Sequence, residues 1–171
     1  MIYHFKIISP EAKNFKIELQ IDGDNTFYTL HETIQKICSY QSHQLASFFI
    51  PNGYGKKAIE ISLLDSGING FPFYSMHRTR ILDLVPPDTR FLLYTFDLFN
   101  DRSLMLELTG IYMEKNQNEP LATLGDGDAP AQTLEEEVEV GESSAQQEDE
   151  VFQDFGVLED YTEIFGEMDP I

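Results

Sequence analysis

The positive and negative charges of this chain are divided unequally, and that division limits what each part can fold into. The 171 residues carry a net charge of −19. Residues 1–118 contain all 11 Lys and Arg against 13 of the 30 Asp and Glu, whereas residues 119–171 contain the other 17 acids and no Lys or Arg. Uncompensated carboxylates repel one another in a compact state. We therefore expect a nearly neutral folded body followed by a polyanionic tail.

The domain boundary follows from where apolar residues become sparse. The chain is 42% apolar and long enough for one domain with a real core. Residues 134–150 are rich in Glu, Ser and Gln, too polar to bury themselves, and are expected to be disordered. We assign residues 1–133 to one α+β domain and residues 134–171 to an acidic, largely disordered tail.

The periodicity of the body predicts strands joined by short turns. Ile17, Leu19 and Ile21 alternate with polar residues, as in a strand with one buried face. The stretch before Asp97 is almost continuously apolar, which indicates a strand covered on both faces. The predicted strands span residues 2–8, 16–21, 44–51, 57–64, 90–97 and 102–113, and the predicted fold is a mostly antiparallel sheet of about five to six strands.

One principal helix is predicted over residues 29–40. Leu30, Ile34 and Cys38 share one helical face. Thr29 and Glu32 have the spacing of a capping box. A short helical turn over residues 80–84 must end before Pro86.

The sequence contains no complete reactive or metal-binding motif. The segment HETIQ begins like a zinc-protease helix, but Gln35 stands where the second His is required. Cys38 lies on the apolar helix face, where thiols usually serve packing. We assign no catalytic, cofactor-binding or metal-binding residue and no cofactor, and we favour a non-enzymatic protein.

The segment from Asp97 to Arg102 allows two interpretations. Asn and Asp favour turns, and apolar stretches lie on both sides, so a hairpin turn is the preferred prediction. The alternative is a hydrolase-like enzyme that uses Asp97, Asp101 and a histidine brought close by folding.

Composition also limits the compartment and the partners. The single Cys38 forms no internal disulfide, the N-terminus lacks a signal-peptide core, and no apolar run could span a bilayer. These features favour a cytoplasmic protein with no membrane contact. The scarcity of cations disfavours direct nucleic-acid binding.

The end of the tail carries apolar residues at helical spacing on an acidic background, within residues 151–169. We expect this amphipathic segment to dock on an unknown basic protein partner, or back onto the domain, through apolar anchors with acids for steering. The alternative is that the tail only increases solubility. The candidate partner-binding residues are Phe152, Phe155, Leu158, Tyr161, Phe165 and Met168.

Three segments together resemble a known family. They are TFYTLHETIQKICSY, the strand QLASFFI, and RILDLVPPDTRFLLYTFD. In order and spacing they are similar to the plasmid Ri open-reading-frame-three-like family, often labelled an insertion-element passenger protein and including TnpR-like proteins of unknown function. The family pattern falls on Leu30, His31, Ile34, Gln35, Ser39, Tyr40, Tyr94, Phe96, Asp97 and Leu98, and approximately on residues 127–130.

The resemblance implies a mixed α+β fold with a largely antiparallel sheet and no established activity. Relatives commonly have a Trp and a His after the Tyr-Asp pair, but this chain has Arg102 and Leu104 there. Any site that those residues form in relatives does not carry over. The passenger label adds a further alternative, an accessory protein in mobile-element or DNA transactions.

Overall fold

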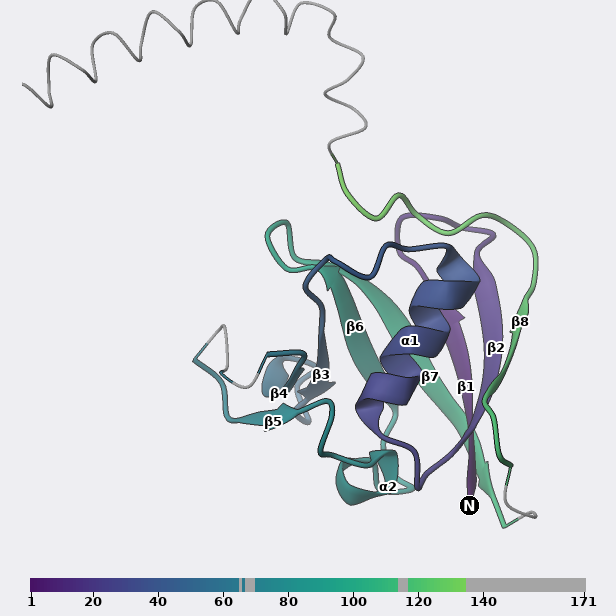
Figure 1. The fold of residues 1–171 in the computed structure, drawn as a ribbon, viewed down its shortest axis with the longest axis vertical. Coiled ribbons are helices and arrows are strands. Elements are labelled where there is room, and N and C mark those ends of the chain that lie inside the picture. Colours follow the sequence, from purple (N-terminus) through teal and green to yellow (C-terminus); the bar gives the residue numbers. More distant parts are fainter. Residues whose placement is uncertain (65, 67–69, 114–116, 135–171) are drawn as a thin grey trace, which may run out of the picture. The chain divides into compact units, whose positions relative to one another are not determined.

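The computed structural model describes residues 1–64, 66, 70–113 and 117–134 (Figure 1). Residues Met1–Gln132 form one compact unit. The predicted partner-binding residues of the tail lie outside the described residues. Within the described part, no helix is long and apolar enough to cross a bilayer.

The body is an α+β fold built on one eight-stranded sheet. The strand order is β5-β4-β3-β6-β7-β1-β2-β8. Neighbouring strands are antiparallel, except that β4 and β5 are parallel. The strands are β1 (Ile2–Ile8), β2 (Lys16–Asp22), β3 (Ser47–Pro51), β4 (Lys57–Ser62), β5 (Phe73–Ser75), β6 (Phe91–Asp97), β7 (Arg102–Tyr112) and β8 (Leu121–Leu124).

The prediction of an α+β fold with a mostly antiparallel sheet is confirmed, but the number of strands is not. The sequence predicts five to six strands, and the structure has eight. The two additional strands, β5 and β8, lie at the edges of the sheet and contain only three and four residues. Strands this short carry too little alternation to be recognised by pattern.

The principal helix, α1 (Phe27–Cys38), begins and ends two residues before the predicted range of 29–40. Thr26 is the N-cap, and its Oγ1 accepts a hydrogen bond from the backbone N of Thr29 at 3.3 Å. The predicted capping role of Thr29 is therefore wrong, because an earlier hydroxyl already caps this turn. At the other end Ser39 has a φ of 57°, a left-handed conformation that ends the helix.

The second helix, α2 (Ile81–Leu84), confirms the predicted helical turn over residues 80–84. Ile81 is fully buried. Pro86 and Pro87 follow soon after the last helical residue.

The core lies between α1 and one face of the sheet, across which the helix runs in Figure 1. Phe27 of α1 packs on Phe48 of β3, with ring centroids 5.4 Å apart. Phe48 in turn packs on Tyr94 of β6 at 4.9 Å. Burial of apolar residues on this face, at about 25 cal/mol per Å², is the main favourable term in folding.

Successive strand residues point to opposite faces, so the neighbours of Phe48 and Tyr94 lie on the face away from α1. A row of hydroxyl residues crosses five adjacent strands there in register. Beside this row Glu60 is fully buried, and its Oε1 accepts a hydrogen bond from Ser47 Oγ at 2.9 Å. The row consists of Ser75, Ser62, Ser47, Thr95 and Ser103.

The buried face of α1 carries a histidine. His31 is 2% exposed, and its Nδ1 shares a hydrogen bond of 2.8 Å with the Tyr94 hydroxyl. Burial, assisted by the nearby charge of His77, lowers the pKa of His31 from 6.5 to about 4. The folded protein therefore holds this imidazole neutral, while the unfolded chain protonates it below 6.5.

We predict that His31 makes the fold sensitive to acid. Because the unfolded state binds the proton first, stability falls as the pH drops from about 6.5 to about 4, by up to about 3 kcal/mol in total. The free energy of unfolding, measured in urea between pH 7 and pH 4, should fall less steeply in His31→Gln than in the wild type. The two proteins have the same carboxylates, so the difference between their curves reports His31 alone.

The control is His43→Gln, which changes an exposed histidine. Its stability should follow the wild-type pH dependence. Parallel curves for His31→Gln and the wild type would contradict the assignment of this acid sensitivity to His31.

Candidate functional site

The connection between β6 and β7 is a hairpin turn, as the sequence predicts. Asp97 Oδ1 accepts a hydrogen bond from the backbone N of Asn100 at 3.1 Å, and Oδ2 accepts one from the Asn100 side chain at 2.9 Å. Asp101 has a φ of 52°. Both features are typical of Asp and Asn in tight turns. The turn therefore fixes the backbone of the two residues at its tip, Leu98 and Phe99.

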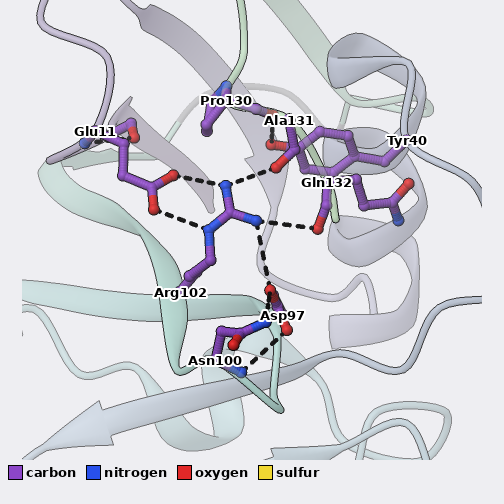
Figure 2. A network of polar contacts seen from close by, with 9 residues as sticks. Glu11, Tyr40, Asp97, Asn100, Arg102, Pro130, Ala131 and Gln132 are labelled. Atoms are coloured by element: carbon purple, nitrogen blue, oxygen red, sulfur yellow. Dashed lines mark hydrogen bonds and ion pairs between the residues drawn. The ribbon is translucent and has the colours of Figure 1, made fainter. Parts of the chain in front are cut away.

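Arg102, the first residue of β7, connects segments that are far apart in sequence (Figure 2). Its Nε and Nη2 donate to the two carboxylate oxygens of Glu11, each at 2.8 Å. Nη2 also donates to the carbonyl of Ala131 at 2.7 Å, and Nη1 to that of Gln132 at 3.4 Å. A planar guanidinium suits such a multiple contact because its donors diverge in a fixed geometry.

The same guanidinium supports the turn. Arg102 Nη1 lies 3.4 Å from Asp97 Oδ2. Its Cζ lies 4.9 Å from the ring centroid of Phe96, within the range of a cation–π contact. Only 9% of the Arg102 side chain is exposed.

These contacts shift the titration of both carboxylates. The hydrogen bond from Arg102 is the main cause that lowers the pKa of Glu11. Burial opposes ionisation of Asp97, but hydrogen bonds from Asn100 and Arg102 outweigh it and leave its pKa below the usual value. The network is therefore fully charged at neutral pH and weakens in acid as the pH falls through these lowered pKa values.

The segment before residue 133 is fastened to the C-terminal end of α1 by further polar contacts. Tyr40 donates its hydroxyl to the carbonyl of Pro130 at 2.7 Å. The backbone N of Gln41 donates to Gln132 Oε1 at 2.6 Å, and Gln132 Nε2 donates to the Gln41 carbonyl at 2.9 Å. Gln132 is thus held by its side chain and by its carbonyl.

A cleft of about 430 Å³ lies beside this network. Three segments form it: the loop before β3, the end of β6 with its turn, and Gln132. Leu45 is 45% exposed and Phe99 is 96% exposed, which is unusual for large apolar side chains in one small area. The lining residues are His43, Gln44, Leu45, Phe96, Asp97, Leu98, Phe99 and Gln132.

The hydrolase alternative places Asp97, Asp101 and a histidine in one site, and the structure brings together only part of this set. Asp97 and His43 line the same cleft. However, both oxygens of Asp97 accept hydrogen bonds from Asn100 or Arg102, which is the geometry of a turn support. Asp101 forms an ion pair with Lys57 and is not among the lining residues.

Two of the four histidines share one environment, and the other two lie apart. His4 packs on Tyr112, with ring centroids 4.3 Å apart, and His43 lines the cleft. His31 and His77 both lie against the Tyr28 ring, at 5.8 Å and 4.1 Å. Among the residues that the structure describes, no three His, Cys, Asp or Glu side chains are grouped to hold a metal ion.

A second cavity, of about 680 Å³, lies between the β3–β4 turn and the loop after α2. Its lining mixes apolar residues such as Ile59 with polar ones such as Asp88 and Arg90. Tyr54, at the tip of the turn, is 91% exposed. Neither cavity is lined by Glu60 or by the row of hydroxyls on the sheet.

Comparison with known proteins places the chain in a family. The model of the family described as Plasmid pRiA4b ORF-3-like protein matches residues 6–155. The chain belongs to this family. The match confirms the resemblance inferred from the helix and strand motifs.

A solved structure has a fold similar to that of this chain. The crystal structure of a protein of unknown function from Methanosarcina mazei Go1 is similar, with a TM-score of 0.55 and 22% sequence identity over 71% of this chain and 67% of the other. No curated protein matches the chain. The family and this neighbour have no known function, so the cleft must be interpreted from its own chemistry.

The sequence places the alternative, hydrolase-like site near Asp97, which lines this cleft, but it does not predict the other walls. It is formed by residues around positions 45, 97 and 132, whose proximity depends on the order of strands in the sheet. One local signal was present: Leu98 and Phe99 stand inside a turn, where polar residues are usual.

We predict that Arg102 supports the stability of this region. Arg102→Ala leaves the poorly exposed Asp97 carboxylate without its cation and two carbonyls without a donor, so the free energy of unfolding should fall by about 2–3 kcal/mol. Urea unfolding at neutral pH measures the loss. Arg102→Lys should recover only part of it, because an ammonium cannot reproduce the paired contact with Glu11.

The matched control is Arg80→Ala. Arg80 also contacts two acids, Asp24 and Asp83, but its side chain is 50% exposed, and such pairs contribute little. Equal losses for Arg80→Ala and Arg102→Ala would show that the Arg102 network adds no more than a surface ion pair.

Proposed function

We propose that this member of the plasmid pRiA4b ORF-3-like family is a cytoplasmic, non-enzymatic protein-interaction module whose acidic tail binds a basic partner. The separation of charge along the chain carries the proposal. All 11 Lys and Arg precede residue 119, and 17 acids follow without one. A polyanionic segment accelerates association with a basic surface and favours it over other surfaces.

The extent of the described core supports this role. Among the described residues, the buried hydrophobic ones run from Ile2 to Leu106, and the strands end at Leu124. The described core is therefore built from residues that precede the acidic tail. We assign the apolar residues of segment 151–169 to recognition, with Phe152, Phe155, Leu158, Tyr161, Phe165 and Met168 as the anchors.

The chemistry of the tail indicates the class of partner. Binding that combines carboxylates with aromatic anchors suits a protein surface on which Lys and Arg surround an apolar groove. A nucleic-acid-binding protein has such a surface, and the tail would compete there with phosphate. This would also fit an accessory role in mobile-element transactions.

A hydrolase is the second candidate function, because Asp97 and His43 line one cleft. A catalytic pair of this kind requires a carboxylate that is free to orient the imidazole. Asp97 accepts three hydrogen bonds from Asn100 and Arg102 instead. We therefore rank this candidate below the interaction module.

We predict that removal of residues 134–171 abolishes capture of the partner from extracts of the native host. Two full-length variants separate the contributions of the tail. Serine at the six anchor positions should weaken binding by at least about tenfold, since buried aromatic anchors dominate interfaces. Replacement of the acids in residues 135–150 by Gln or Asn should instead slow association and reduce its dependence on salt.

Circular dichroism of the tailless protein controls for folding of the body. A peptide of residues 149–171, titrated onto the tailless protein, distinguishes docking on a partner from docking on the chain's own body. Capture of the same partners by the intact and the tailless protein, at equal yield, would contradict the proposal.

A further inference from the structure

The cleft beside Arg102 presents apolar surface in a rigid form. Phe99 is 96% exposed at the tip of a turn that Asp97 and Asn100 hold by two hydrogen bonds. These bonds fix the backbone of the turn, so the Cα of Phe99 is held at the rim of the cleft and its ring lies in solvent. Such preorganisation lowers the entropy cost of binding.

The other walls are fixed as well. Phe96 is 2% exposed and packs on Tyr40, with ring centroids 5.3 Å apart. Gln132 is held by two hydrogen bonds to Gln41. The cleft is therefore a formed feature of the body, and its volume of about 430 Å³ lies within the usual range of binding pockets.

The lining sets the polarity of the occupant. Leu45, Phe96, Leu98 and Phe99 supply apolar surface, with Gln44 and Gln132 as polar neighbours. An apolar centre with a polar rim is the arrangement of a protein-binding hot spot. The fitting occupant is an aliphatic or aromatic side chain.

The charge of the cleft and of the chain that follows it indicates the class of partner. The lining contains no Lys or Arg. Its one carboxylate, Asp97, is paired with Arg102, and Asp101 of the same turn is paired with Lys57, so these two acids add little net charge. The chain that continues from Gln132 carries 14 further acids and no Lys or Arg. An acidic occupant finds no cation in this lining and is repelled by those 14 acids, whereas a basic one is attracted by them.

We propose that this cleft is a second recognition site, which receives an aliphatic or aromatic side chain of the same basic partner. The proposal rests on the tail-mediated function above and adds a site on the body. The two sites differ in what they contribute: the acids of the tail raise the rate of encounter, and the cleft lengthens the lifetime of the complex.

The test uses the full-length protein and two fluorescein-labelled peptides. Both peptides consist of Lys and Gly; one carries a central Phe-Leu pair, and its twin carries Ser-Ser. Fluorescence anisotropy gives both dissociation constants. We expect the Phe-Leu peptide to bind at least about tenfold more tightly than its twin, because one well-buried apolar side chain supplies at least that factor.

Three variants locate the preference. Phe99→Ser and Leu45→Ser change exposed side chains, so the body should fold, and each should reduce the preference to less than about threefold while leaving the twin unaffected. Tyr54→Ser is the matched control, since Tyr54 is 91% exposed and lines the other cavity. Equal affinity for the two peptides, or an equal loss in Tyr54→Ser, would overturn the proposal.

Failure of the tail proposal gives a different result. Neutralising the acids of residues 135–150 should lower the affinity for both peptides by the same factor and preserve the preference for the Phe-Leu peptide. If the affinity for neither peptide falls, the tail proposal fails while the cleft proposal stands. Competition for the cleft by a peptide of residues 149–171 would overturn the choice of a basic occupant.

Discussion

The shape of the cleft depends on the hydrogen bonds and ion pairs that the guanidinium of Arg102 makes. It donates to both carboxylate oxygens of Glu11, to Asp97 in the turn, and to the carbonyls of Ala131 and Gln132 (Figure 2). Residues 125–132 lie outside the regular strands and are held by contacts with other segments, among them a backbone hydrogen bond from Gly125 to Lys16 and the contacts of Tyr40 and Arg102. Of these groups, Arg102 bonds both to the turn that carries Phe99 and to the segment that carries Gln132.

The sequence predicts the long elements because each carries a clear period. In β2, Ile17, Leu19 and Ile21 are all buried, and the intervening polar residues keep alternation unambiguous. The start of α1 is shifted because two threonines compete as caps, and only contact with the rest of the fold decides between them. Thr26 caps the helix because this start places Phe27, which is fully buried, against Phe48.

The site could not be predicted in the same way, since no local period encodes it. Arg102 contacts Glu11, which lies 91 residues earlier, and the carbonyls of residues 131 and 132, which lie 29 and 30 residues later. Its importance follows from the sheet order, in which β1 and β6 both pair with β7. The exposed Phe99 is different, because the apolar pair Leu98 and Phe99 inside a predicted turn is visible in the sequence itself.

Charge pairing distinguishes the body from the tail. The ordered cations Arg102, Arg80 and Lys57 each bind at least one carboxylate, so much of the body's negative charge is neutralised locally. The acids after residue 132 have no Lys or Arg of their own segment to pair with. Local pairing lowers the net charge of the body, whereas the sequence of the tail supplies no cation to do the same; fields of this kind act over ~8 Å at physiological salt. The two proposed modes of recognition differ in kind: the proposed role of the tail rests on its charge, and the proposed role of the cleft rests on its apolar lining and so calls for a neutral side chain.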